Sequence, residues 1–126
     1  MGPEAKFYQN VKQNFKQFSL IRLENISLLG TPDLLVCNTS GNFCTIELKV
    51  TKGNKLRFSP HQIGFHIKHP HNTFILVKQA KKPSQGSFKL FPGTCILALV
   101  KEGFKNEDAC CLSLAACGLW LSELGA

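Results

Sequence analysis

Acidic residues are scarce in this chain of 126 residues, which has 8 aspartates and glutamates against 15 lysines and arginines, for a formal net charge of +7. This balance argues against a basic partner and favours a polyanionic one, with nucleic acid as the first candidate. One alternative stays open at this point, namely that the excess charge only keeps the protein soluble.

Long apolar segments are also missing. The most apolar part of the chain, residues 109–121, is too short to cross a lipid bilayer. The N-terminal residues include Glu4 and Lys6 instead of the apolar core of a signal peptide. We therefore expect a soluble, cytoplasmic protein with no membrane partner, in a cell or an infected host, folded as a single domain of residues 1–126.

Cysteine pairs with metal-binding or disulfide-scaffold spacing are absent, although the chain has six cysteines: Cys37, Cys44, Cys95, Cys110, Cys111 and Cys117. We interpret them as free thiols of a reduced, intracellular protein. A zinc site made by Cys110, Cys111, Cys117 and a histidine is the alternative. Adjacent cysteines seldom bind one metal together, which disfavours it.

The most informative stretch is residues 30–50, whose sequence is GTPDLLVCNTSGNFCTIELKV. It alternates as two strands at 33–37 and 43–49 would, joined by a loop at 38–42. One face of this hairpin is wholly apolar and must be buried: Leu34, Val36, Cys44, Ile46, Leu48 and Val50. Burying that face fixes a register in which Asp33 lies directly opposite Glu47.

This register gathers chemically active groups at one end of the hairpin. Opposed residues have Cβ atoms about 4.5 to 5.5 Å apart, and Lys49 joins the same face about 6.6 Å along the strand from Glu47. Two carboxylates this close repel each other unless a cation lies between them. Mg²⁺ binds in this way, through one or two carboxylates plus waters and phosphate oxygens. Asp33 and Glu47 therefore predict a Mg²⁺ site, with Mn²⁺ as a substitute.

Helices and strands are predicted on both sides of the hairpin. In chain order they are a helix over 4–17, a strand over 20–24, a helix from residue 60, a central parallel strand over 73–77, an edge strand over 87–91, a short helix near 96–100 and a second, largely buried helix over 109–123. In the helix that Ser59 caps and Pro60 begins, we expect Ile63 and Ile67 to face the core. Gly64 should let that helix approach the sheet closely.

The hairpin motif resembles the PD-(D/E)XK nuclease signature, which here reads Pro32-Asp33, then Glu47-Leu48-Lys49, with Gly30-Thr31 leading into it. Two flanking pieces are similar to those of small stand-alone members, the virus-type replication-repair (VRR-NUC) nucleases and the Holliday-junction resolvases: Arg22-Leu23-Glu24-Asn25 and Ser59-Pro60-His61-Gln62. The resemblance covers roughly residues 4–79.

The resemblance implies an α/β, restriction-endonuclease-like fold, with an αβββαβ core, a mixed sheet flanked by helices, and extra C-terminal helices. It implies a metal held by Asp33, Glu47 and the backbone carbonyl of Leu48, and phosphodiester hydrolysis in which Lys49 orients the attacking water or stabilises the developing charge. The alternative is an ordinary strand face on which a Glu and a Lys happen to be neighbours.

Other residues complete the predicted site. A further acid from upstream is typical of the family; we favour Glu24, with Glu4 as the alternative. Gln62 should hold a phosphate oxygen, a water or Lys49. Nucleic-acid contacts are predicted for two basic loops: Lys52, Lys55 and Arg57, and Lys78, Lys81 and Lys82. The four histidines, His61, His66, His69 and His71, are interpreted as surface or DNA-facing residues.

We therefore predict a Mg²⁺-dependent, structure-selective DNA endonuclease that acts on branched DNA or Holliday junctions. A homodimer is implied because two sites are needed to cut both strands, and residues 112–124 with Trp120 are its candidate interface. Two alternatives remain: a catalytically inactive nucleic-acid-binding module of the same fold, and a nuclease of this fold that acts on RNA or on simple duplex DNA.

Overall fold

The structure is a computed structural model that describes residues 2–23, 30–80 and 86–125. Its elements are α1 (Pro3–Asn14), β1 (Ser19–Arg22), β2 (Leu34–Cys37), β3 (Phe43–Thr51), α2 (Pro60–Lys68), β4 (Thr73–Ala80), β5 (Gly86–Pro92), η1 (Gly93–Cys95), α3 (Ile96–Glu102), η2 (Gly103–Lys105) and α4 (Leu114–Ser122). The order αβββαβ, followed by a fifth strand and further helices, confirms the predicted fold class.

The strands form one mixed sheet in the order β1-β2-β3-β4-β5. β3 and β4 are parallel neighbours joined through α2, and the other adjacent pairs are antiparallel. The central position predicted for β4 and the edge position predicted for β5 are both confirmed. A parallel pair needs a crossover, and α2 supplies it.

The predicted register of the hairpin is confirmed. Leu34 pairs with Ile46 and Val36 with Cys44, and all four side chains are at most 4% exposed. A slip of one residue would turn this apolar face to the solvent, so burial specifies the pairing. Asp33 and Glu47, which are the next residues beyond the Leu34 and Ile46 pair, consequently lie across from each other.

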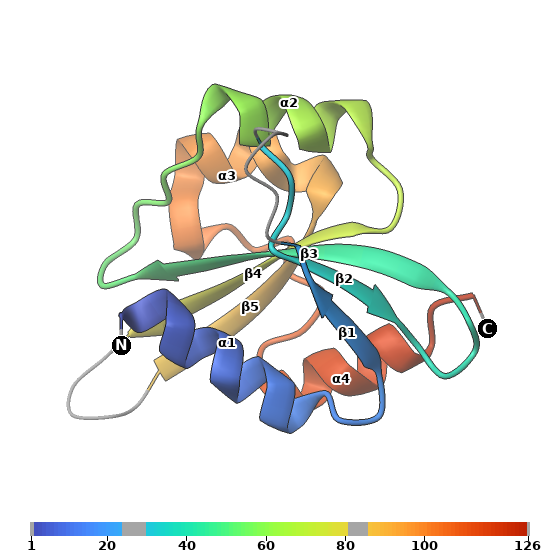
Figure 1. The fold of residues 1–126 in the computed structure, drawn as a ribbon. Coiled ribbons are helices and arrows are strands. Elements are labelled where there is room, and N and C mark those ends of the chain that lie inside the picture. The colour runs from blue at the N-terminus through green and yellow to red at the C-terminus, as the bar shows by residue number, and fades with distance from the viewer. Residues whose placement is uncertain (1, 24–29, 81–85, 126) are drawn as a thin grey trace.

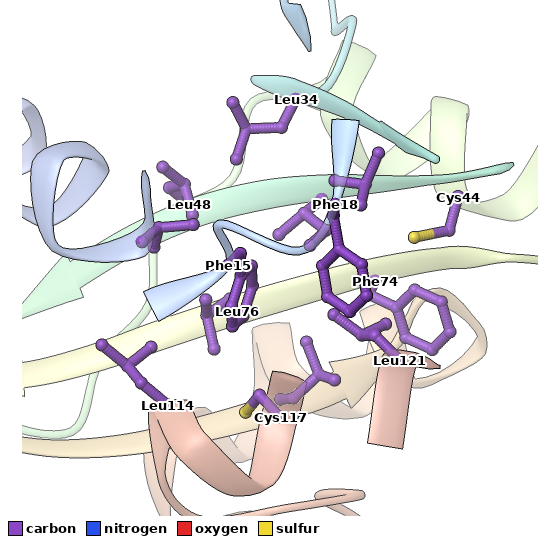
Figure 2. Packing of buried hydrophobic residues seen from close by; sticks show 14 of the residues in the cluster. Phe15, Phe18, Leu34, Cys44, Leu48, Phe74, Leu76, Leu114, Cys117 and Leu121 are labelled. Atoms are coloured by element: carbon purple, nitrogen blue, oxygen red, sulfur yellow. The ribbon is translucent and has the colours of Figure 1, made fainter. Parts of the chain in front are cut away.

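Two helical layers cover the sheet, with α1 and α4 on one face and α2 and α3 on the other (Figure 1). The first face carries the larger core, in which Leu114, Cys117 and Leu121 of α4 point toward Phe74 and Leu76 of β4 (Figure 2). The second core is smaller: Leu56, Ile75, Val77, Phe91, Ile96, Leu99 and Phe104. Side-chain alternation places Glu47 and Lys49 on this second face.

The start of α2 is as predicted, and Ile63 packs against the smaller core as expected, but Ile67 does not. Ser59 and Gln62 form a capping box and Pro60 is the first helical residue. The side chain turned inward is His66, which is 1% exposed, whereas Ile67 is 56% exposed. A side chain added at Gly64 would meet nothing within 4 Å, so this glycine permits no close approach to the sheet.

A glycine elsewhere explains why His66 fits inside. A Cβ at Gly93, the first residue of η1, would lie 2.9 Å from Nδ1 of His66 and closer still to the hydroxyl of Thr73. The missing side chain at this position makes room for the imidazole ring. Hydrophobic spacing on α2 alone could not reveal a space created 27 residues later in the chain.

The C-terminal helix is shorter than predicted, because the first part of 109–123 is extended. Cys111 forms an isolated antiparallel bridge with Leu90, and the side chain of Ser113 then accepts the N–H of Ala116 as the helix cap. At the other end of the chain, α1 stops at Asn14 and not at residue 17. Within the described ranges no helix is long and apolar enough to cross a membrane.

Candidate active site

Asp33 and Glu47 are brought together where β2 begins. Asp33 lies one residue before β2, and its Oδ2 accepts the backbone N–H of Leu48 at 2.8 Å. Glu47, in the middle of β3, is only 3% exposed. The hydrogen bond fixes the Asp33 carboxylate against β3, beside the Glu47 carboxyl group.

The Glu47 carboxyl group is incompletely satisfied. Its Oε2 accepts a hydrogen bond from Nε2 of Gln62 at 3.3 Å, but Oε1 is buried and has no partner among the described residues. Burial, and after it the neighbouring Asp33, raise the pKa of Glu47 to about 9, while Lys49 opposes the shift. A cation bound between the two carboxylates would offset the repulsion between Asp33 and Glu47 and would give Oε1 of Glu47 a partner.

Lys49, two residues after Glu47 on β3, extends its side chain toward the same site. Its Nζ donates to Oε1 of Gln62 at 3.1 Å and lies 4.9 Å from the ring centroid of Phe58. Gln62 therefore contacts both Glu47 and Lys49; of these two, only Lys49 was among the partners that the sequence indicated for it. Oε1 of Gln62 also accepts the N–H of Ser59, which ties the α2 cap to the site.

Glu4 is the upstream acid that the structure places near this pair. It lines a cavity of about 40 Å³ together with Tyr8, Arg22, Asp33 and Leu48, and its charge adds to the rise in the Glu47 pKa. Glu24, which the sequence analysis favoured, lies outside the described residues. The structure therefore supplies geometry for the alternative only.

Tyr8 and Arg22 line that cavity but received no role in the sequence analysis. The guanidinium of Arg22 lies 4.7 Å from the Tyr8 ring centroid. A signal for both existed: Tyr8 follows Glu4 by one helical turn, and Arg22 opens the Arg-Leu-Glu-Asn piece. The sequence spacing of Tyr8 and Arg22 alone does not indicate a catalytic or binding role; the fold is needed to bring them to the cavity.

The site suits a hard divalent cation. No group of three or more His, Cys, Asp or Glu side chains with metal-binding geometry occurs in the part of the chain that the structure describes. A metal would thus depend on Asp33, Glu47 and backbone oxygen, with water completing its shell, which is a donor set that Mg²⁺ accepts. The small cavity beside Asp33 has room for a water or an ion.

Of the predicted phosphate contacts that the structure describes, those of the 52–57 loop adjoin the site and Lys78 does not. Lys52, Lys55 and Arg57 line a groove of about 370 Å³ together with Lys49 and Glu4. Lys78 belongs to the opposite face of the sheet, where its Nζ lies 6.0 Å from the Phe88 ring centroid. Lys81 and Lys82 lie outside the described residues.

His66 corrects the interpretation of the histidines. The other three, His61, His69 and His71, are exposed as predicted, but His66 is buried and both of its ring nitrogens lack a partner among the described residues. Burial lowers the pKa of His66 to about 4, and the charge of Lys49 contributes. The ring is therefore neutral near pH 7.

The C-terminal segment divides its apolar residues between core and surface. Leu114, Cys117 and Leu121 are buried, and the Sγ atoms of Cys111 and Cys117 lie 3.0 Å apart. Leu112 and Leu119 are 66% and 72% exposed, and the Trp120 ring meets Phe74 edge-on at 5.3 Å. Part of the predicted interface is thus used within the chain.

Comparisons with known proteins support the fold. No protein-family model matches the chain, and no curated protein matches it. Among solved structures, the chain is similar to Hjc of Archaeoglobus fulgidus, a Holliday junction resolvase from an archaeal hyperthermophile. The two share 16% sequence identity over 74% of this chain and 75% of that one, with a TM-score of 0.55. At this identity the likeness shows the fold.

Proposed function

We propose that the chain is a metal-dependent nuclease that hydrolyses phosphodiester bonds in DNA, with residues 1–126 as one nuclease domain. The observation that carries this proposal is the buried Oε1 of Glu47, which has no partner in the described part of the chain and lies beside Asp33 and Lys49. Buried polar atoms are normally satisfied, and exceptions concentrate at functional sites. The resolvase-like fold and the PD-(D/E)XK-like motif support the same assignment.

Each residue has a distinct part in this proposal. Asp33, Glu47 and the backbone carbonyl of Leu48 would hold Mg²⁺, or Mn²⁺ in its place, with Glu4 or Glu24 as a further acid. When bound, the metal supplies charge stabilisation for the scissile phosphate and lowers the pKa of water. Lys49, held by Gln62, presents an ammonium group that can stabilise negative charge as it develops on the phosphate.

Branched DNA is the substrate that we favour, and Lys52, Lys55 and Arg57 are the proposed phosphate contacts. The fold shared with a Holliday junction resolvase supports this choice over RNA or simple duplex. A homodimer belongs to the same proposal, with the exposed Leu119 in its interface. The proposal also includes action inside a cell, which fits a DNA substrate and the six free cysteines. Membership of the VRR-NUC group rests on the motif alone.

The test compares wild type with Asp33→Ala and Lys49→Ala on a four-way junction, a flap, linear duplex DNA, single strands and an RNA duplex. Each reaction is run in Mg²⁺, in Mn²⁺ and in EDTA. We expect metal-dependent cleavage of the junction or the flap, reduced at least about a thousandfold in both variants. Lys16→Ala, which removes an exposed lysine two residues after the end of α1, is the matched control and should cleave like wild type.

The alternatives have different outcomes in the same assay. Binding without cleavage in any metal would identify an inactive binding module and contradict the proposal. Preference for RNA or for linear duplex would keep the chemistry and overturn the substrate. Cleavage that survives in both variants would show that Asp33 and Lys49 are not the site.

A further inference from the structure

We propose that the surface for the nucleic-acid backbone continues from the loop at 52–57 onto Lys105, and that Asn54 holds these two segments side by side. Lys105 ends η2, near the C-terminal end of α3, and belongs to no motif that the sequence indicated. This inference rests on the proposed function, because it extends the groove beside the candidate active site.

Asn54 joins the two segments through its side chain and its backbone. Its Nδ2 donates to the carbonyl of Glu102 at 2.7 Å, and its Oδ1 accepts the backbone N–H of Lys105 at 2.6 Å. Its own carbonyl accepts the N–H of Phe104 at 2.8 Å. Three hydrogen bonds from one residue thus fix where Lys105 lies relative to Lys52 and Lys55.

The close approach depends on a glycine. Gly103 has φ +75°, and a Cβ there would overlap the backbone carbonyl and the side-chain amide of Asn54. A residue with a side chain would therefore be strained at this position and would also push the loop away. The two segments pack backbone against backbone only because residue 103 is glycine.

Both segments are also tied to the sheet. Gln79 of β4 donates to the carbonyl of Gly53 at 2.6 Å, which holds the loop. On the other side, Nζ of Lys89 donates to the carbonyls of Phe104 and Asn106 at 2.7 and 3.3 Å. The surface is therefore ordered before any ligand binds, which lowers the entropic cost of binding.

The lysines on this surface differ from Lys89 in having no partner. Lys52, Lys55 and Lys105 are exposed, and within the described ranges none of their ammonium groups forms an ion pair or a hydrogen bond. Holding unpaired like charges on neighbouring segments is unfavourable in the free protein. A strand of phosphates neutralises them, and its counterion release adds to the affinity.

The experiment measures binding of a four-way DNA junction by the full chain as a function of salt concentration. EDTA is present throughout so that the junction is bound without being cleaved. Lys105→Ala should lower the slope of log K against log[salt] by about 0.9 and weaken binding about fivefold at 0.15 M salt. Asn54→Ala should lower the slope by at least as much although it removes no charge. Lys16→Ala, with the same charge change as Lys105→Ala, should leave the slope unchanged.

A second readout separates positioning from general damage. The thermal unfolding midpoint of Lys105→Ala should match that of wild type and of Lys16→Ala, because both lysines are exposed. An unchanged salt slope in Lys105→Ala, or an equal change in Lys16→Ala, would overturn the inference. Failure of the wild type to bind any DNA would overturn the proposed function itself, so the two failures are distinguishable.

Discussion

Among the described residues, the sheet face under α1 and α4 has a core of sixteen buried apolar residues, whereas the face under α2 and α3 has a core of seven. The buried side-chain polar atoms without partners among the described residues belong to Thr45, Glu47 and His66, all on the second face. Unpaired buried polar groups lower stability. The comparison indicates that the first face contributes more to the stability of the fold, while the second face holds the groups for which we propose a catalytic role.

The largest expected effect comes from truncating neighbours on β4 that point to opposite faces. Leu76 and Ile75 are both 0% exposed, and Ile75 is in register with Glu47. Leu76→Ala and Ile75→Ala should each lower the free energy of unfolding by about 2 to 5 kcal/mol, because each leaves a cavity. Only Ile75→Ala should also slow cleavage per folded molecule. Equal cleavage rates in the two variants would contradict the claim that only the face under α2 and α3 supports cleavage.

The pH dependence of stability tests the second face through His66. The pKa of His66 is lowered from 6.5 to about 4. Between these two pH values the imidazole is therefore protonated in the unfolded chain but neutral in the folded chain. Stability should therefore fall by up to about 3 kcal/mol as the pH drops from 6.5 to 4. Urea unfolding of wild type and His66→Leu should show the variant gaining relative stability across this window. The exposed His71→Leu is the control, and a matching gain there would contradict the assignment.

Replacing Glu47 should separate stability from activity. The pKa of Glu47 is raised from 4.5 to about 9, so the folded chain retains a proton that the unfolded chain releases, and stability is lost as the pH rises through this range. Glu47→Gln removes this penalty, and its amide can donate to Asp33. In EDTA at pH 7 the variant should be about 1 to 3 kcal/mol more stable than wild type by thermal unfolding. A less stable variant would show that the carboxyl group is structural.

The smallest effect concerns Gln62, which belongs to the helix cap and also contacts Glu47 and Lys49. Gln62→Ala should cost about 1 kcal/mol of stability and reduce the rate constant of cleavage about 10- to 100-fold. Ser59→Ala breaks the same capping box without touching the site, so it should match the stability loss and keep the rate. A rate loss of the same size in Ser59→Ala would assign the effect to the helix.

What the sequence could predict follows from the ranges over which its patterns act. The hairpin register and the proximity of Asp33, Glu47 and Lys49 depend on local alternation, which one buried face enforces. The inward turn of His66 depends on the space left by Gly93, and the shortened α4 depends on the bridge from Cys111 to Leu90. Such long-range contacts leave no periodic trace. For the same reason the sequence could suggest the cations of the 52–57 loop as phosphate contacts but gave no sign of Lys105, whose proposed role depends on contacts between distant segments.

The most direct test of this account is single-turnover cleavage of a four-way junction by wild type and Glu47→Gln, each in Mg²⁺ and in EDTA. We predict that wild type cleaves only in Mg²⁺ and that Glu47→Gln, although folded, cleaves in neither. Cleavage by Glu47→Gln at the wild-type rate, or cleavage by wild type in EDTA, would show that the incompletely hydrogen-bonded carboxyl group of Glu47 does not belong to a metal-dependent catalytic site.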